Sequence, residues 1–460
     1  MINIVKKGGR MTTFMRHRSP AEILMFGFAA VIFRGAVILN LPVSSASGQS
    51  PGFLNCLFTA TSSVCVTGLV VVDTGTYWSL FGQIVIILLI QIGGLGFMSL
   101  MTIFFVLAGK RITIKNRLLI QSSVNSDRVQ GVVKFTKYIV FSCLVIEGIG
   151  ALLLSFVFVP DYGLGKGIYF GIWHSISSFC NGGFDLIGGF QSFTGYANNF
   201  LLNFTVCALI VVGGLGFAVT SEIVSYRTTR RLSMHSKIVL SITAILVVGG
   251  AVLFYIFEHA NPETMGNLPW YGKIYAAFYQ SVTPRTAGSN TISQTGLNPV
   301  SKVLTIVLMF IGGSPGSTAG GVKTTAVAMM AITLFTELMG RKDVTCFKRR
   351  IPEITIKRAA CVLTIGISII IVIIMVLMVC EPGADPMAIT FEVFSAYSTV
   401  GLTCDLTPHL HALSKVALII TMFIGRVGPL TIAYVITRKE RKELENKGQF
   451  KLPEGNVLIG

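Results

Sequence analysis

Charged residues are scarce in this chain. Asp, Glu, Lys and Arg make up 12% of the 460 residues, whereas hydrophobic residues make up 52%. About a quarter of the residues of a soluble domain are charged, so this composition excludes a soluble protein and predicts one that crosses a membrane several times. Eight apolar stretches reach the roughly 20 residues that a spanning helix needs: 22–42, 83–108, 136–159, 199–225, 237–257, 303–339 (interrupted), 359–380 and 415–437.

Clusters of metal-binding or catalytic side chains are also missing. The nine cysteines form no C-x-x-C pair and no cluster with histidine, so we expect neither a redox motif nor a bound structural metal. No set of residues resembles a catalytic constellation, and we therefore expect no enzyme activity and no covalent cofactor. The first apolar run is too long for a cleavable signal peptide and lacks a small-residue cleavage site, so we expect it to act as a signal anchor.

Positive charge is plentiful but confined to a few segments. The net charge is +17, yet residues 42–82 contain no Lys or Arg. Alternate loops with and without positive charge are typical of a multi-pass protein whose basic loops are cytoplasmic. We therefore expect a lipid membrane, and no nucleic acid, as the partner of this charge, and both termini in the cytoplasm. Five segments hold 29 of the 37 basic residues: 1–19, 109–137, 226–237, 340–358 and 438–460.

Four short segments resemble one another and end in a single glycine. These glycines, Gly68, Gly183, Gly288 and Gly401, recur at nearly equal intervals along the chain, and such a period indicates a quadruplicated unit. Each glycine follows a segment too short to cross the membrane, which suits a half-helix that enters and returns. The four segments are Gly52–Ser62, Gly167–Phe179, Trp270–Ser281 and Met387–Ser395.

The period predicts an all-α polytopic membrane protein with four tandem helix–pore-loop–helix repeats around a single pseudo-fourfold pore. Irregular backbone at membrane depth is tolerated only where protein or water covers it, so the four loops are expected to line one wet axis together. The expected division is a cytoplasmic N-terminus at 1–19, repeats at 20–110, 111–228, 229–340 and 341–437, and a cytoplasmic C-terminal tail at 438–460.

The chemistry expected of these loops is cation selection by backbone carbonyl groups. Carbonyl oxygens replace the hydration shell of a cation, and glycine adopts the positive φ angles that aim them at one axis without steric cost. Four oxygens per layer suit a large monovalent ion, and Asp73, Asp185 and Asp405 are expected to concentrate cations nearby. The candidate filter residues are Val66, Thr67, Gly68, Asn181, Gly182, Gly183, Thr286, Ala287, Gly288, Thr399, Val400 and Gly401.

Each unit carries a second glycine cluster, at a similar distance after its loop glycine. In the first two units we interpret it as close helix packing. The third cluster breaks an apolar span, and we expect its loop, 312–324, to be an intramembrane gate beneath the filter. A phosphate-binding P-loop is excluded because Val322 spoils the required spacing. The candidate gate residues are Gly312, Gly313, Ser314, Pro315, Gly316, Ser317, Thr318, Ala319, Gly320, Gly321, Lys323 and Arg426.

Two arginines stand close to these motifs. Arg426 occupies the glycine cluster of the fourth unit, and a charge within a span usually faces a cavity or a partner. It either faces the pore and repels cations, or bonds the backbone carbonyls of the broken helix. Arg285, just before the third loop glycine, is expected to tie the carbonyls of its short helix rather than to contact the ion.

These motifs together resemble the Trk/Ktr/HKT superfamily of potassium transporters, and within it the bacterial KtrB-type subunits. The resemblance runs from about residue 20 to 460 and rests on the four glycine loops and three further strings: Thr283–Gly288, Gly312–Lys323 and Gly425–Pro429. Two positions depart from the family pattern. Ser289 replaces a common aromatic residue, and Pro315 lies where small residues are usual.

The resemblance implies potassium uptake across the bacterial plasma membrane, with potassium bound at the filter carbonyls and Arg426 helping to close the gate. It implies a homodimer, with the tail Pro453–Gly460 at the dimer interface. It also implies a cytosolic KtrA-type regulatory ring. The nucleotide (ATP, ADP or NAD) is expected to bind to this ring and not to this chain. Some family members depend on sodium.

Two other functions compete with a gated potassium channel. A symporter that couples potassium to sodium or protons would need an ionisable residue inside the membrane. We expect each candidate to lie near the end of a span or in a loop, which weakens this alternative: Glu22, Glu147, Glu222 and Glu392. A scaffold or receptor that transports nothing would leave the four glycine loops unexplained.

Overall fold

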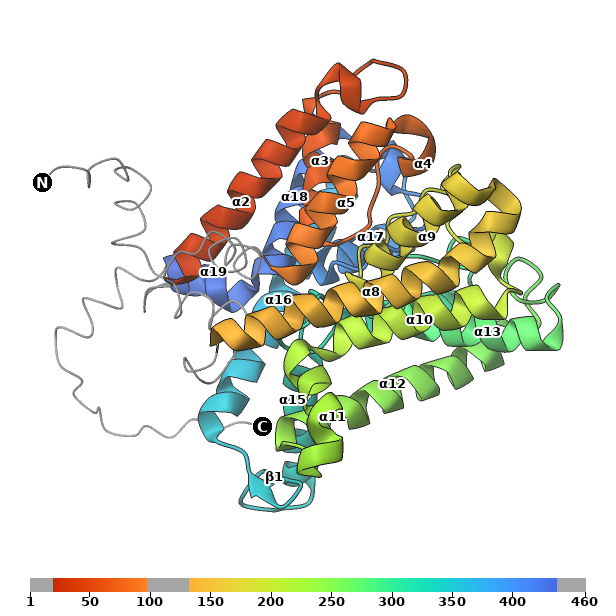
Figure 1. Ribbon diagram of the computed structural model, residues 1–460. Coiled ribbons are helices and arrows are strands. Elements are labelled where there is room, and N and C mark those ends of the chain that lie inside the picture. Colours follow the sequence, from red (N-terminus) through yellow and green to blue (C-terminus); the bar gives the residue numbers. More distant parts are fainter. Residues whose placement is uncertain (1–19, 97–131, 437–460) are drawn as a thin grey trace, which may run out of the picture.

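The structure is a computed structural model that describes residues 20–96 and 132–436. The described chain is almost entirely helical (Figure 1). The expectations for the N-terminus 1–19, for the junction of the first two repeats within 97–131 and for the tail from 437 onward lie outside the described residues.

Four described helices are long and apolar enough to cross a membrane. Most of their outward side chains are apolar, as lipid requires: Phe141 is 71% exposed and Val379 81% exposed. The chain is therefore a multi-pass membrane protein, as its composition predicts. The four helices are α2 (Pro20–Leu39), α8 (Val132–Tyr162), α12 (Met234–Glu258) and α16 (Glu353–Cys380).

A shorter helix of 13 to 16 residues follows each long one. At 1.5 Å per residue such a helix is about 20–24 Å long, less than the roughly 30 Å hydrocarbon core. The four lie where the sequence predicts them, and each ends a few residues before a loop glycine. They are α3 (Phe53–Cys65), α9 (Leu164–Phe179), α13 (Trp270–Val282) and α17 (Pro386–Ser398).

A further apolar helix follows each loop. Helix α18 packs against α3, so the last of these helices lies beside the first short helix of the chain (Figure 1). This contact brings the two ends of the described chain together. The helices are α5 (Leu80–Leu95), α10 (Phe200–Leu215), α14 (Pro299–Phe310) and α18 (Ala412–Val427).

The predicted continuous spans 199–225 and 415–437 are wrong. Helix α10 stops at Leu215, and α11 (Phe217–Thr229) leaves it at an angle of 101°. The hinge is Gly216, whose φ of +94° ends the helix, because only glycine adopts this region without strain. Gly428 (φ +92°) separates α18 from α19 (Pro429–Ile436) in the same way.

The third of these helices is broken by a longer insertion. Helix α14 ends at Phe310, and the next helix is α15 (Thr324–Leu338). We call the residues between them, 311–323, the interrupting loop. A single parallel bridge between Ile311 and Val322 closes its base, so the loop leaves and re-enters the helical path at nearly the same point.

Glycines on α5, α10 and α18 let these helices touch the ends of the short helices. A Cβ atom at Gly93, Gly213 or Gly425 would collide with a backbone carbonyl oxygen. The three carbonyls belong to residues four before a loop glycine, namely Val64, Phe179 and Tyr397. Small residues allow such close helix contact, which agrees with the packing role expected of the clusters in the first two units.

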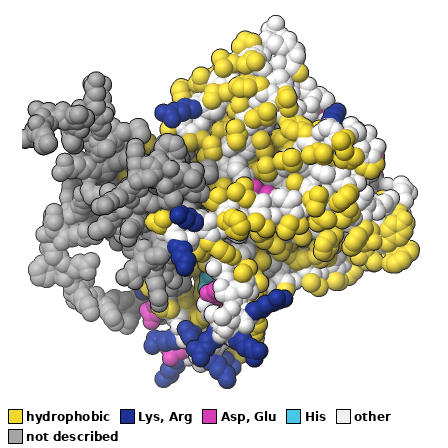
Figure 2. Space-filling view, viewed as in Figure 1, with side chains coloured by type: hydrophobic (Ala, Val, Ile, Leu, Met, Phe, Trp, Pro, Cys, Tyr) yellow, Lys and Arg dark blue, Asp and Glu magenta, His cyan; other side chains and the backbone are white. Residues whose placement is uncertain are grey.

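A short basic hairpin joins α15 to α16. Strand β1 (Thr345–Cys346) pairs antiparallel with β2 (Arg349–Arg350). Figure 2 shows Lys and Arg side chains gathered around this end of the molecule, whereas most of the remaining visible surface is apolar. The gathering corresponds to the basic segment 340–358 of the sequence.

Substituting Gly93 by alanine tests the close helix contact. The added methyl group would press on the Val64 carbonyl oxygen, and overpacking of this kind costs about 1–3 kcal/mol. We expect a clear fall in the midpoint of thermal unfolding of the detergent-purified protein. Gly148→Ala on α8 is the matched control, since nothing lies within 4 Å of its added carbon. An equal midpoint for both variants would refute the contact.

Candidate functional site

The four loop glycines, Gly68, Gly183, Gly288 and Gly401, contact one another in a closed ring. A Cβ atom added at Gly68 would lie 2.7 Å from the Gly182 carbonyl oxygen, and one at Gly183 would lie 2.7 Å from that of Ala287. The same addition at Gly288 meets the carbonyl of Val400, and at Gly401 that of Thr67. Each loop therefore touches the next, and the fourth returns to the first.

The backbone of every loop has the same unusual shape. The loop glycines have φ angles between +71° and +96°, and the residue two before each glycine also has a positive φ. For residues other than glycine this costs of order 1–3 kcal/mol, which persists only where the surroundings enforce it. Repeated strain at equivalent positions indicates a functional geometry. The strained residues are Val66 (+57°), Asn181 (+61°), Thr286 (+72°) and Thr399 (+52°).

Hydroxyl groups of the short helices hold the loops in this shape. The Ser62 Oγ accepts a hydrogen bond from the Gly68 amide at 3.1 Å, and the Ser395 Oγ accepts one from the Gly401 amide at 3.0 Å. In the second loop the Ser177 Oγ donates to the Phe184 carbonyl at 2.7 Å. All three serines precede their loop glycine by six residues, so equivalent positions perform this task.

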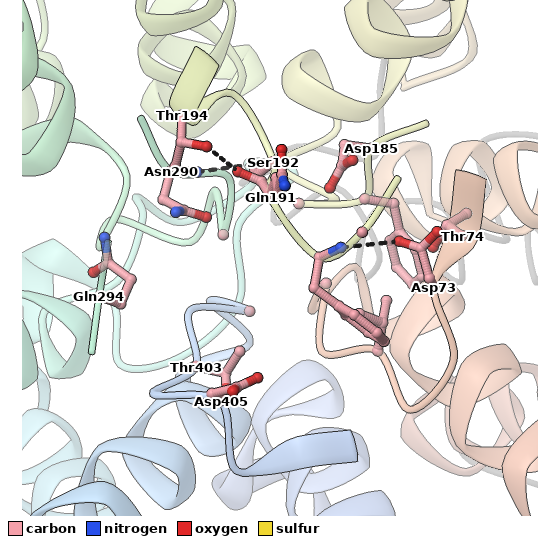
Figure 3. A pocket seen from close by; sticks show the side chains of 18 of the residues that line it. Asp73, Thr74, Asp185, Gln191, Ser192, Thr194, Asn290, Gln294, Thr403 and Asp405 are labelled. Atoms are coloured by element: carbon pink, nitrogen blue, oxygen red, sulfur yellow. Dashed lines mark hydrogen bonds between the residues drawn. The ribbon is translucent and has the colours of Figure 1, made fainter. Parts of the chain in front are cut away.

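The ring opens into a polar cavity of about 330 Å³. All four loop glycines line the cavity, together with Asp73, Asp185 and Asp405, which come from three different loops (Figure 3). The short helices also direct their C-terminal ends, each worth about half a negative charge, toward the ring. The electrostatic field of the site therefore favours a cation over an anion.

The interrupting loop packs against the ends of short helices and the start of the fourth glycine loop, on the side away from the cavity. A Cβ atom at Gly320 would collide with Thr399, and one at Gly321 would lie 3.0 Å from the Ser398 backbone. The Thr318 Oγ1 donates to the Phe179 carbonyl at 3.2 Å. The interrupting loop is thus in contact with the C-terminal ends of α9 and α17 and with the first residue after α17.

The interrupting loop also satisfies the backbone groups freed where α10 breaks. The amides of Ser314 and Thr318 donate to the carbonyls of Gly214 and Gly213, at 3.0 and 3.3 Å. The first amide of α11, Phe217, donates to the Gly316 carbonyl at 2.9 Å. Unpaired backbone groups in a membrane cost several kcal/mol each, so the bend and the loop stabilise each other.

Two partly buried cationic side chains bind the carbonyls of the interrupting loop. Arg426 donates to the carbonyl of Thr318 and, with its other terminal nitrogen, to that of Gly93 on α5. The Lys323 Nζ donates to the Ala319 carbonyl at 2.8 Å and to that of Gly320 at 3.4 Å. Arg426 therefore binds one carbonyl of the broken helix, as in the second role foreseen for it, and one carbonyl of α5.

Two expectations for individual residues need correction. Arg285 donates to the Thr243 hydroxyl on α12 at 3.2 Å, so it ties the third loop to a long helix rather than to its own short helix. Glu147 was expected near the end of a span, but it lies halfway along α8 and is only 5% exposed. Gln91 donates to both of its carboxylate oxygens, at 3.0 and 3.1 Å.

Both departures from the family pattern fit into the structure. The Ser289 hydroxyl is 2.6 Å from the hydroxyl of Tyr279 on α13, so an aromatic ring from the short helix stands behind the third loop. Pro315 lies at the bend of α10, where its carbonyl oxygen would be 2.7 Å from a Cβ atom added at Gly216.

Several polar residues that line the cavity were not foreseen from the sequence. They include Gln191, Ser192 and Thr194 from the segment between α9 and α10, and Asn290 and Gln294 from the third unit (Figure 3). One signal was present. In the second unit the second glycine cluster follows its loop glycine at a longer interval than in the other three units, and the extra residues belong to this segment.

The described fold and the glycine ring have the features of one class of membrane protein. The chain crosses a membrane several times and brings four strained backbone loops to one point beside a cavity lined with carboxylates. No residue group in the described ranges 20–96 and 132–436 has the ligand set of a metal centre. The arrangement is that of a membrane transporter for a cation.

Comparison with known proteins gives the family. The profile of TrkH-type cation transport proteins matches residues 10–446, and the chain belongs to this family of transporters, which is not a class of enzymes. The potassium/sodium uptake protein NtpJ of Enterococcus hirae is 41% identical, with 96% of this chain and 97% of that protein covered. The Ktr system potassium uptake protein B of Bacillus subtilis is 37% identical at the same coverage.

A solved structure agrees on the fold. The potassium transporter TrkH from Vibrio parahaemolyticus superposes with a TM-score of 0.73 at 16% identity, covering 92% of this chain and 86% of that one. The family match and the two relatives confirm the expected membership of the Trk/Ktr/HKT superfamily.

The cavity predicts a pH dependence of cation transport. Burial, and second the nearby Asp73 carboxylate, raise the pKa of Asp185 to about 6. Below this pH Asp185 is neutral, and the cavity loses a negative charge. We expect cation flux at subsaturating concentration to fall by roughly twofold to fivefold between pH 7.5 and pH 5, with equal pH on both sides of the membrane.

Asp185→Asn should show the low flux at both pH values, because its side chain carries no charge to lose. Glu263→Gln, an exposed carboxylate outside the cavity lining, is the control and should keep the pH dependence. A wild-type pH dependence that survives in Asp185→Asn would assign the titration to another group.

Proposed function

We propose that the chain is the ion-translocating subunit of a Ktr-type potassium uptake system in the bacterial plasma membrane. The observation that carries the proposal is the closed ring of loop glycines, in which four backbone carbonyl groups lie next to one another beside an acidic cavity. The names of the relatives support potassium as the ion. In this proposal the chain has four repeats, 20–110, 111–228, 229–340 and 341–437, around one pseudo-fourfold pore.

The ring is the selectivity filter of this proposal. The carbonyl oxygens of Thr67, Gly182, Ala287 and Val400 are the ones that meet a neighbouring loop glycine. A dehydrated potassium ion would be bound by these oxygens in place of its water shell. The cavity lies on the outer side, and both termini lie in the cytoplasm, as the distribution of basic residues predicts.

The interrupting loop is the gate. It lies against the filter segments on the side away from the cavity, and Arg426 and Lys323 hold it there through three successive carbonyl groups. Opening requires these bonds to break together. We propose that a homodimer of this chain receives the opening signal from a cytosolic KtrA-type ring, to which the nucleotide binds.

A coupled symporter is the alternative, and one observation favours it more than the sequence did. Glu147 is a buried carboxylate at mid-helix, 3.9 Å from the Cys180 sulfur in the second loop. Such a residue is a candidate ion carrier. The name of the Enterococcus relative mentions sodium as well as potassium.

Reversal potentials in proteoliposomes separate the two functions. For the gated channel, the potential of zero current follows the potassium gradient alone. The test imposes a sodium or proton gradient on vesicles that do not themselves leak sodium or protons. A shift of that potential would refute the gated channel and support the coupled symporter. Vesicles with no cation flux at all, with or without the regulatory ring, would reject both.

Gly288→Ser tests the filter. Its side chain would collide with the Val400 carbonyl at a φ of +81°, so the ring would lose its shape. We expect the potassium-to-sodium permeability ratio to fall roughly tenfold, equivalent to about 1.4 kcal/mol. Gly383→Ser, where nothing lies within 4 Å of the added carbon, should keep the wild-type ratio. An unchanged ratio in Gly288→Ser would remove this residue from the filter.

Shortening the interrupting loop tests the gate. Deletion of Gly316–Thr318 removes the carbonyl bound by Arg426, and Arg426→Gln weakens the same contact without shortening the chain. Hydrogen bonds to charged groups contribute about 1.5–3 kcal/mol, so we expect flux without the regulatory ring to rise about tenfold or more. Normal yield with unchanged basal flux in both variants would show that the loop is not a gate.

A further inference from the structure

One position of the short helices has four different occupants. The residue nine before each loop glycine is fully or almost fully buried in every unit, with an exposed fraction of 1% or less. The residue types share neither size nor charge, unlike the loop glycines themselves. The four residues are Thr59 on α3, His174 on α9, Tyr279 on α13 and Glu392 on α17.

In the third unit the side chain at this position forms a hydrogen bond with the residue that follows the loop glycine. The hydroxyl groups of Tyr279 and Ser289 are 2.6 Å apart, and both side chains are buried. The Ser289 carbonyl also accepts a hydrogen bond from Thr283. Ser289, the first residue after Gly288, is therefore held through both its side chain and its carbonyl group.

In the second unit the side chain at the same position forms a hydrogen bond with the backbone three residues after Gly183. The His174 Nε2 accepts a hydrogen bond from the Leu186 amide at 3.1 Å. Its Nδ1 therefore carries the proton and donates to the Phe170 carbonyl at 2.8 Å. This imidazole connects the short helix to the segment that presents Asp185 to the cavity.

In the fourth unit the anchored residue lies six positions after Gly401. Glu392 accepts a hydrogen bond from the Thr407 hydroxyl, which in turn lies 3.5 Å from that of Thr403, a residue of the cavity lining. The first unit differs, because the Thr59 hydroxyl donates to the Asn55 carbonyl within its own helix, at 2.9 Å.

A ring of carbonyl groups discriminates between ions by its size and by the number and strength of its dipoles. Both depend on how firmly each loop is held between the short helix that enters it and the segment that leaves it. A buried hydrogen bond to the leaving segment restricts that loop, and the restriction is greatest when the bond is nearest to the glycine. The three bonds lie one, three and six residues away.

We propose that in the second, third and fourth units the residue nine before the loop glycine is a positioning residue that sets the ion selectivity of its loop through the leaving segment. The effect is strongest for Tyr279, weaker for His174, weaker again for Glu392, and absent for Thr59. The inference rests on the proposed function, since it assigns residues that tune the same filter.

The test measures bi-ionic reversal potentials of the full-length protein in proteoliposomes. Tyr279→Phe keeps the ring and removes the hydroxyl group, while Ser289→Ala removes its partner. We expect each variant to lower the potassium-to-sodium permeability ratio by about threefold to tenfold, the range expected for one lost buried hydrogen bond. The double variant should be no worse than either single one, because both lack the same bond.

Thr59→Val is the matched control at the equivalent position and should leave the ratio unchanged. A purely structural defect would lower the amount of active protein and hence the flux, but not the permeability ratio. Should Tyr279→Phe fail to fold, Ser289→Ala tests the same bond from the loop side. His174→Gln retains a hydrogen-bond acceptor and should preserve more of the permeability ratio than His174→Leu.

The inference is overturned if Tyr279→Phe and Ser289→Ala both keep the wild-type ratio, or if Thr59→Val lowers it as much as they do. These outcomes differ from a failure of the proposed function. If the proposed function fails, the wild-type protein itself shows no potassium-selective reversal potential, whatever the variants do.

Discussion

Four backbone segments approach one another so closely at one point that none of them has room for a side chain. The rest of the described structure depends on this constraint. It requires glycine in each loop and holds the residue two before it at a strained φ angle, and in two of the loops a serine six residues earlier supports the glycine amide. It also explains the second set of glycines on α5, α10 and α18, because those helices must touch the carbonyl ends of the short helices. Close packing then replaces the water that irregular backbone would otherwise need at membrane depth.

The surroundings of this ring are much less regular than the ring. The break of α10 and the insertion after α14 are coupled, since the amides of the interrupting loop pair with the last carbonyls of α10. Arg426 joins this pair of elements to α5, from the opposite part of the chain. Four unlike residues occupy equivalent positions behind the loops. In the proposed function, ion selection belongs to the regular part and its control to the irregular part. A change in one loop contact therefore affects several elements at once.

The sequence allowed accurate prediction where one physical requirement recurs in every unit. The short helices and the loop glycines follow from length and spacing, because segments this short cannot cross a bilayer and only glycine fits the ring. The bend at Gly216 was missed because α10 and α11 form one apolar run, and apolarity alone does not show where a helix turns. The partner of Arg285 and the depth of Glu147 depend on tertiary packing, which no local pattern records. No sequence pattern marks the positions nine residues before the loop glycines, because these positions have no residue type in common. The extra residues that line the cavity left only one trace, the longer spacing in the second unit.

The central claim is that the carbonyl groups of Thr67, Gly182, Ala287 and Val400 form a single cation site. An experimental structure determined in rubidium, with the anomalous signal of that ion, tests it most directly. We expect an anomalous peak enclosed by the four loops, at a similar distance from all four carbonyl oxygens, that disappears when lithium replaces rubidium. A ring without anomalous density, with rubidium bound only at Asp73, Asp185 or Asp405, would contradict it.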